Sequence, residues 1–307
     1  MSEHVLVIGE ALVDVVVRAD GGQETHPGGS PANVALGLAR LGREADLLTR
    51  LGLDPNGVLV ADHLQDNGVR LVPGSAGPAS TSVATATIGP DGAATYDFDV
   101  TWDLGTGIRM RQAPLAVHTG SIAAVLAPGA AAVHRLVKAL RHNTTVTYDP
   151  NARPALMGDP GEARAAIEEF VALADVVKAS DEDLAWLAPA EDIEDVARAW
   201  ASMGPAFVVV TRGGEGATAF VHDGREVSVA APRVTVADTV GAGDSFMSGI
   251  IDGLWEAQLL GGSRRTDLHA ISDATLTGVL TECVRIGAIT VSRPGANPPT
   301  REELDAS

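Results

Sequence analysis

The segment from Asp238 to Phe246 contains the residue types that phosphoryl transfer requires. It reads Asp-Thr-Val-Gly-Ala-Gly-Asp-Ser-Phe, and the apolar residues that follow recur at helical spacing, so a helix is predicted to begin near Asp244. The backbone amides of residues 241–243 would then lie at a helix N-terminus, where N–H groups and the helix dipole bind anions. Asp244 beside them could accept a proton from a hydroxyl group. Together these features indicate a site where a hydroxyl attacks a phosphoryl group.

Asp244 also has a simpler interpretation, because aspartate is common as a cap at helix N-termini. Capping alone does not explain the Gly-Ala-Gly turn, whereas a base beside an anion hole explains both features. The sequence contains no Gly-x-x-x-x-Gly-Lys-Ser/Thr, and no Gly-x-Gly-x-x-Gly follows the first apolar run. A P-loop enzyme and a dinucleotide oxidoreductase are therefore both disfavoured.

A second glycine-rich turn spans residues 28–33, Gly-Gly-Ser-Pro-Ala-Asn, and precedes a helical pattern that runs to Gly42. Ser30 is predicted to be the N-cap of this helix, with Pro31 at its first position. Upstream, Asp14 interrupts an apolar strand. A carboxylate in that setting is costly unless it has partners or faces water on an edge strand, and the sequence leaves both open.

The elements around these motifs alternate between strands and helices. Predicted strands lie at 5–9, 12–17, 116–119, 145–148, 176–178 and 207–211, and predicted helices at 131–141, 162–173 and 193–203. This order indicates a mostly parallel sheet covered by helices, with ligands beyond the carboxyl ends of the strands. Polar clusters fall at those ends, at 149–153, 178–183 and 211–213. Residues 82–88 and 93–100 read as a hairpin with its turn at 89–92, which would form a small sheet with the Asp14 strand.

Composition excludes several classes of protein. The formal net charge is −18 with no basic stripe, which argues against nucleic-acid binding. The N-terminus lacks the basic region of a signal peptide and no 18-residue apolar run is present, so we expect no membrane span and a cytoplasmic protein. The one cysteine, Cys283, sits in an apolar helical pattern and is predicted to be a buried thiol. Residues 261–269, polar and glycine-rich, read as an exposed loop.

In its two glycine motifs the chain resembles the PfkB, or ribokinase-like, carbohydrate kinase family. Segments 28–33 and 238–246 match the two signature regions of that family in the expected order, and the likeness spans nearly the whole chain. The resemblance implies one α/β domain over residues 1–307, with a three-layer α/β/α core and a mostly parallel sheet. It also implies a small β-sheet lid from about residues 11–27 and 79–105, whose closure would exclude water from ATP.

The resemblance assigns roles to individual residues. Asp244 would be the general base, and Gly241, Ala242 and Gly243 would stabilise the phosphoryl group. Sugar binding would fall to Asp14, Gly28, Gly29, Asn33 and Arg153, although Arg153 could instead be a surface residue. The nucleotide would contact Lys178, Ser180, Thr211, Gly213, Gly216 and Asn297.

The resemblance also implies metal ions. ATP phosphates in so acidic a protein require Mg²⁺. Ser180 and Asp183 stand where many members carry the Asn and Glu of an Asn-x-x-Glu motif, so Asp183 would hold Mg²⁺ through water. A K⁺ ion would bind the backbone carbonyls of Asp238, Val240, Arg293 and Gly295.

Several segments look closest to fructokinases, namely Gly-Glu-Ala-Leu-Val-Asp at 9–14, Asp-Pro-Asn-x-Arg at 149–153 and Lys-x-Ser-Asp-Glu-Asp at 178–183. Fructose, phosphorylated at its 6-hydroxyl, is therefore the first candidate. 2-Keto-3-deoxygluconate, ribose and nucleosides remain alternatives, as does a non-catalytic sugar-binding protein, although the catalytic motif is complete. Tyr96, Phe98 and Trp102 are candidates either to line the sugar pocket or to pack the lid. Lid strands could also pair two subunits in a homodimer.

Overall fold

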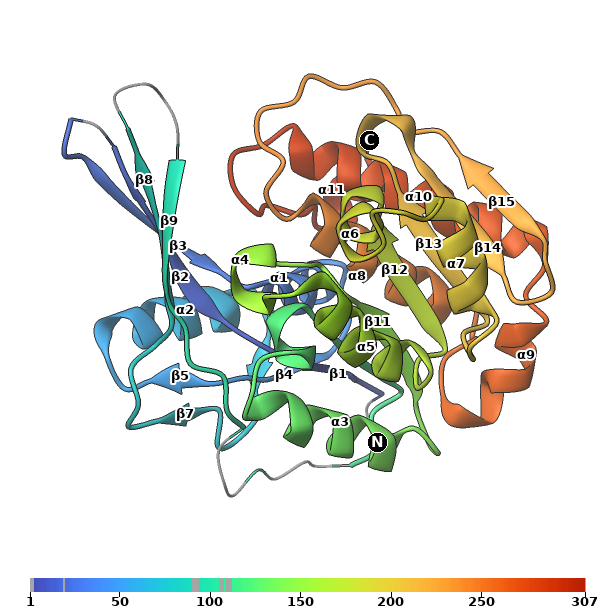
Figure 1. The fold of residues 1–307 in the computed structure, drawn as a ribbon, viewed down its shortest axis with the longest axis horizontal. Coiled ribbons are helices and arrows are strands. Elements are labelled where there is room, and N and C mark those ends of the chain that lie inside the picture. The colour runs from blue at the N-terminus through green and yellow to red at the C-terminus, as the bar shows by residue number, and fades with distance from the viewer. Residues whose placement is uncertain (1–2, 19, 90–93, 105–107, 109–111, 307) are drawn as a thin grey trace.

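A large sheet forms the centre of the protein (Figure 1). The computed structural model describes residues 3–18, 20–89, 94–104, 108 and 112–306. Within these residues nine strands pair in the order β15-β14-β13-β12-β11-β10-β1-β4-β6. All neighbours are parallel except β14, which is antiparallel to both β13 and β15. The strands span Val5–Ile8 (β1), Ala45–Leu48 (β4), Arg70–Leu71 (β6), Ala116–Gly120 (β10), Thr145–Asp149 (β11), Val176–Ser180 (β12), Phe207–Thr211 (β13), Ala217–Val221 (β14) and Glu226–Val229 (β15). The mostly parallel sheet is confirmed.

Helices cover both faces of this sheet, which explains why strands such as β1 and β10 are buried along their whole length. One apolar core contains residues of α1, α2, α8, α9 and α10, and the other contains residues of α3, α5, α6 and α7. The three-layer architecture is thus confirmed. The helices span Ser30–Arg40 (α1), Pro55–Asp66 (α2), Gly129–Leu140 (α3), Pro154–Met157 (α4), Pro160–Val171 (α5), Asp181–Leu187 (α6), Ile193–Ala201 (α7), Ala242–Glu256 (α8), Arg265–His269 (α9), Asp273–Val291 (α10) and Arg301–Asp305 (α11), with 3₁₀ turns at Ser121–Ala124 (η1), Gly213–Glu215 (η2) and Gly262–Arg264 (η3).

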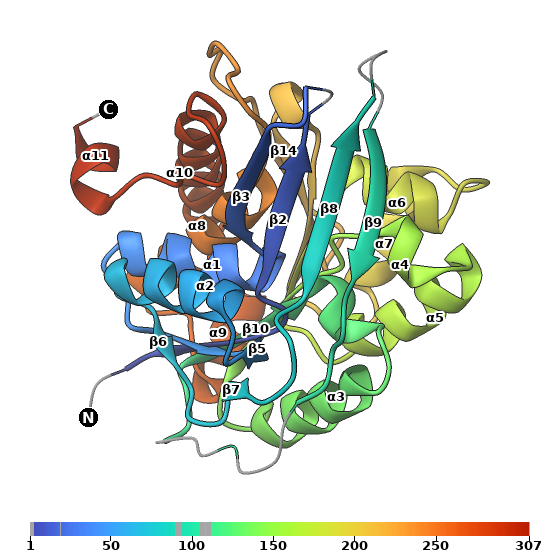
Figure 2. The same ribbon diagram turned by 90° about the vertical axis from the view of Figure 1, so that its left-hand side faces the viewer.

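A small four-stranded sheet stands apart from the main sheet, and Figure 2 shows its strands side by side above α1 and α2. Its order is β3-β2-β8-β9, and the strands span Leu12–Val17 (β2), Gln23–Gly28 (β3), Val83–Ile88 (β8) and Ala94–Asp99 (β9). The predicted hairpin and its pairing with the Asp14 strand are confirmed. Residues 90–92 of the predicted turn, residue 93 of the second predicted strand and residue 105 of the predicted lid lie outside the described residues. A two-stranded pair, Leu51–Gly52 (β5) with Ala76–Gly77 (β7), lies nearby.

Two segments differ from the sequence-based expectations. β3 reads Gln-Glu-Thr-His-Pro-Gly and has no apolar strand pattern, yet it pairs with β2 along its full length. The predicted exposed loop at 261–269 is wrong, because η3 and α9 occupy it. Arg265 anchors this segment through an ion pair with the buried Asp175. Hairpin pairing with β2 in the first case, and a long-range ion pair in the second, thus order segments whose local sequence is polar.

Helix α10 is the one helix in the described part of the chain that is long and apolar enough, by length and composition, to cross a membrane. A single such helix is weak evidence, since the core helices of globular proteins pass the same test. α10 packs along α8 and buries Leu276, Leu280 and Cys283 against it. Packing in the core therefore accounts for its apolar character, and the prediction of a buried Cys283 is confirmed.

Candidate active site

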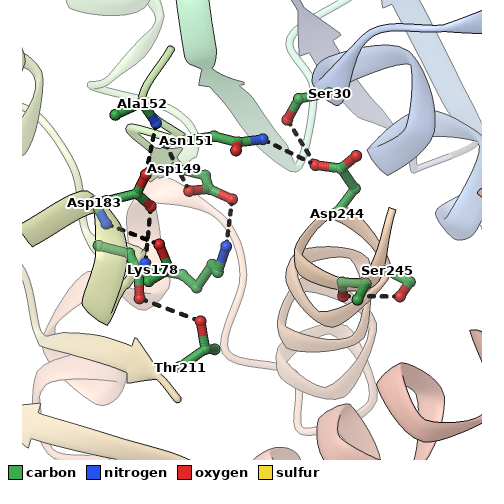
Figure 3. A network of polar contacts seen from close by, with 12 residues as sticks. Ser30, Asp149, Asn151, Ala152, Lys178, Asp183, Thr211, Asp244 and Ser245 are labelled. Atoms are coloured by element: carbon green, nitrogen blue, oxygen red, sulfur yellow. Dashed lines mark hydrogen bonds and ion pairs between the residues drawn. The ribbon is translucent and has the colours of Figure 1, made fainter. Parts of the chain in front are cut away.

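Asp244 lies in the first turn of α8, and three side chains from two parts of the chain, helix α1 and the loop after β11, hold its carboxylate (Figure 3). Oδ1 accepts hydrogen bonds from Ser30 Oγ at 2.7 Å and from Asn151 Nδ2 at 3.2 Å, and Oδ2 accepts one from Asn33 Nδ2 at 2.8 Å. The residue is 5% exposed. Because α8 has no side-chain cap, the capping interpretation of Asp244 is wrong. These three hydrogen bonds satisfy the buried carboxylate and fix its orientation.

Ser30 also differs from its predicted role. The N-cap of α1 is Gly29, which has no side chain with which to cap, and Ser30 is the first helical residue. Its hydroxyl donates to Asp244 instead of capping its own helix. Since 214 residues separate the two partners, no local pattern could have shown this bond.

The glycine turn before α1 fits closely against the β1–β2 connection. Gly29 has φ 107°, and a Cβ there would lie 2.6 Å from the carbonyl oxygen of Glu10. A Cβ at Gly28 would lie 2.0 Å from Asp14 Oδ2, so the Asp14 carboxylate rests against that glycine. Burial raises the pKa of Asp14, while the positive charges of Arg153 and His26 oppose this shift. The structure thus brings together the residues that were predicted to contact the sugar.

Lys178 lies on the other side of the α8 N-terminus. It is 3% exposed, and its Nζ pairs with Asp149 Oδ2 at 2.9 Å. A Cβ on Gly243 would come within 2.8 Å of this Nζ, so the ammonium group lies directly beside the 241–243 turn. Burial lowers the pKa of Lys178, but Asp149 and Asp183 raise it more, so the group stays charged. A cation next to helix N-terminal amides is suited to bind a phosphoryl group.

Asp183 is held by the backbone. Its Oδ1 accepts from Ala152 N at 2.7 Å and its Oδ2 from Ser180 N at 2.9 Å, while Ser180 Oγ caps α6 through the Asp183 amide. Among the residues that the structure describes, no group of three or more His, Cys, Asp or Glu is arranged to hold a metal ion. The magnesium role of Asp183 therefore stays a prediction.

The residues predicted to contact the nucleotide fall into two places. Thr211 pairs in register with Ser180 at the carboxyl ends of β13 and β12, and Gly213 and Gly216 follow with φ 47° and 112°. Asn297 lies elsewhere, and its Oδ1 accepts a bond of 2.5 Å from Arg40 Nη1. The first group adjoins Lys178 along the sheet edge, whereas Asn297 lies close to the 238–241 turn.

The predicted potassium ligands lie on two segments that Asp238 joins. Its Oδ1 accepts from Val240 N at 3.0 Å, and its Oδ2 accepts from Gly295 N at 2.8 Å. The Arg293 side chain turns away to Glu303. The segments therefore meet as the potassium prediction requires, and the prediction itself stays open.

The three aromatic candidates have different outcomes. Trp102 is 2% exposed, donates from Nε1 to the Ala123 carbonyl and packs in the core on the α3 side of the sheet. Trp102 therefore packs in the main core and not in the lid, which differs from the packing that the sequence suggested. Phe98 is partly exposed on β9, and the side chain of Tyr96 lies outside the described part of the chain.

Glu10 is a site residue that the sequence reasoning missed. It is 6% exposed in the connection that follows β1, and its Oε2 has no hydrogen-bond partner among the described residues. Burial raises its pKa to about 7, although a bond from Ser121 and the charge of Arg153 oppose this shift. An acidic residue directly after a fully buried strand was the one available signal.

We expect Glu10→Gln to change the pH dependence of stability. Below its unfolded pKa, near 4.5, Glu10 is protonated in both states, and its stabilising effect is lost as pH rises through its folded pKa of about 7. At pH 8 the variant should be more stable than wild type by about 3 kcal/mol relative to their difference at pH 4. Urea unfolding at both pH values measures this. An unchanged difference would show that Glu10 ionises in the folded protein as it does in water.

Comparisons with known proteins agree with this geometry. The model of the family described as "pfkB family carbohydrate kinase" matches residues 2–303 of this chain. A fructokinase of Rhizobium leguminosarum bv. trifolii is 34% identical over 269 residues, covering 83% of this chain and 81% of the relative. A Vibrio cholerae fructokinase, solved with fructose, ADP and potassium, is 28% identical with TM-score 0.82, covering 99% and 97%. An aminoimidazole riboside kinase from Salmonella enterica, solved with the riboside and an ATP analogue, is 27% identical with TM-score 0.79, covering 99% of each chain.

The three-layer fold, the separate small sheet and an acid beside a glycine-bounded helix N-terminus define the ribokinase-like class. The chain belongs to the pfkB family of carbohydrate kinases and is an ATP-dependent sugar kinase.

Proposed function

We propose that this kinase phosphorylates fructose at its 6-hydroxyl. Several curated fructokinases are similar to this chain. The Rhizobium protein is 34% identical and the Escherichia coli protein 29% identical. The three fructokinase-like segments of the sequence support the same acceptor. Asp14, Gly28, Gly29, Asn33 and Arg153 would bind the sugar hydroxyls.

The observation that carries the proposed mechanism is the position of Asp244 and Lys178 on either side of one helix N-terminus. Asp244 takes the proton of the sugar hydroxyl while the oxygen of that hydroxyl attacks the γ-phosphorus of ATP. The bond from that phosphorus to the oxygen of ADP breaks, and negative charge grows on the transferring group. The amides of 241–243 and the Lys178 ammonium stabilise that charge.

The nucleotide phosphates would extend from this turn toward Ser180, Thr211, Gly213 and Gly216, with Asn297 on the adenine side. Mg²⁺, held through water by Asp183, would neutralise phosphate charge. K⁺ would bind the carbonyls of Asp238, Val240, Arg293 and Gly295, and potassium is named in the Vibrio cholerae structure. The small sheet would close as a lid over the sugar, and its strands could pair two subunits. The protein would be a single domain and would act in the cytoplasm.

The acceptor is tested by ADP formation with ATP, Mg²⁺ and K⁺ against fructose, ribose, 2-keto-3-deoxygluconate, glucose, adenosine and aminoimidazole riboside. Fructose is expected to give the highest kcat/KM. The riboside is the second candidate, because the Salmonella enzyme shares the fold over nearly its whole length. A higher kcat/KM with any other acceptor would replace fructose. No turnover with any of them would leave an acceptor outside this panel or a non-catalytic sugar-binding protein, which ligand-induced thermal shifts would distinguish.

A further inference from the structure

Asp149 occupies the centre of the site but has no role in the mechanism above. It is the last residue of β11 and is completely buried. Its two carboxylate oxygens have different partners: Oδ2 pairs with Lys178 Nζ at 2.9 Å, and Oδ1 accepts from Asn151 N at 3.1 Å. Figure 3 shows it lying between Lys178 and Asn151, whose side chain reaches Asp244. One side chain thus contacts both the phosphate side and the base side of the site.

The contact with Asn151 extends to the base. Asn151 has φ 34°, a left-handed conformation that asparagine adopts more readily than most residues. In this conformation its backbone N–H donates to Asp149 while its side-chain amide donates to Asp244 Oδ1 at 3.2 Å. A continuous series of polar contacts therefore runs from Lys178 through Asp149 and Asn151 to Asp244.

We propose that Asp149 is a positioning residue, which places the Lys178 ammonium beside the 241–243 turn and orients the Asn151 amide on the Asp244 carboxylate. The proposal rests on the proposed roles of Asp244 and Lys178. Asp149 itself is completely buried and acts through its two neighbours. Its effect is geometric and electrostatic, because a misplaced base or cation costs rate even when both groups are present.

The ion pair makes charge essential at this position. Burial raises the pKa of Asp149 to about 6 against the opposing effect of Lys178, so the pair is ionised at neutral pH. Removing one partner of a buried pair leaves the other charge uncompensated. Without Asp149, burial would favour a neutral Lys178 that attracts phosphate less strongly.

The test compares Asp149→Asn with the matched control Asp175→Asn. Asp175 is also a buried aspartate, 1% exposed, that pairs with a cation (Arg265) and accepts a backbone N–H (from Val146), but it precedes β12 at the opposite edge of the sheet. Asp149→Asn is expected to lower kcat between about tenfold and a hundredfold, with the KM for sugar changed less than about threefold. Asp175→Asn should leave kcat within about twofold of wild type when kcat is calculated per folded molecule.

Two further measurements separate positioning from stability. In a double-mutant cycle, the double variant Asp149→Asn with Asn151→Ala should lose less kcat than the two single variants predict when their effects are combined. The reason is that Asn151 acts through the same contacts. The dissociation constant of a non-hydrolysable ATP analogue should rise about fivefold in Asp149→Asn and stay unchanged in Asp175→Asn.

The outcomes are distinct. Equal kcat losses in the two aspartate variants, or an unchanged analogue affinity in Asp149→Asn, would overturn the positioning role. Full activity in an Asp244 variant would instead overturn the proposed base, while the analogue titration still decides the role of Asp149. That titration requires no sugar, so it applies whichever acceptor is correct.

Discussion

Asp244→Asn is expected to lower kcat for sugar phosphorylation by at least about 10³-fold, because the amide cannot accept the hydroxyl proton. The substitution keeps the size of the side chain, but its amide nitrogen replaces one acceptor oxygen, so the hydrogen bonds that Ser30, Asn33 and Asn151 donate cannot all be kept. The KM values for sugar and ATP should change little, since binding does not require proton transfer. Steady-state ADP formation measures all three constants.

Asp273→Asn is the matched control. Asp273 also lies in the first turn of a helix, α10, but there it is exposed and pairs with Arg225. Its variant should retain wild-type kcat. If Asp244→Asn also retained more than about a tenth of wild-type kcat, Asp244 would be an orienting residue and another group would be the base.

Lys178→Met is expected to lower kcat by about 10²- to 10³-fold, the usual cost of removing one donor that stabilises a transition state. Methionine has a similar length and fills the buried site without a charge. The effect should be larger on kcat than on the KM for ATP, because charge on the transferring group grows toward the transition state. Saturation kinetics with ATP separates the two constants.

Lys138→Met provides the control for this prediction. Lys138 is exposed near the end of α3, and its variant should behave as wild type. Lys178→Met could instead lower only the stability of the protein. A normal kcat per folded molecule would then contradict a role for Lys178 at the anion site.

The sequence predicted the parts of the site that depend on local pattern. The helix beginning beside Asp244, the Gly-Ala-Gly turn and the alternation of strands and helices all follow from residues close together in the chain. Gly28 and Gly29 were recognised as a glycine-rich turn before a helix, and the structure adds that a side chain at either position would collide with Asp14 or Glu10.

The contacts that complete the site could not be predicted in this way. Ser30 and Asn151 reach Asp244 across 214 and 93 residues of sequence, and Asp149 reaches Lys178 across 29. These distances along the chain are closed only when parallel strands place their carboxyl ends at one edge. Ser30 was predicted to cap its own helix, because sequence patterns identify only hydrogen bonds between residues close together in the chain.

The sequence contains two lysines, Lys138 and Lys178, and their surroundings are opposite: one is exposed and the other is 3% exposed beside the 241–243 turn. Amine-reactive labels should therefore modify Lys138 at once and Lys178 only when the core around it opens. Mass spectrometry of the two peptides gives a ratio in which the fast site is an internal standard. The protein thus contains a built-in chemical probe of how tightly its phosphate-binding edge is held.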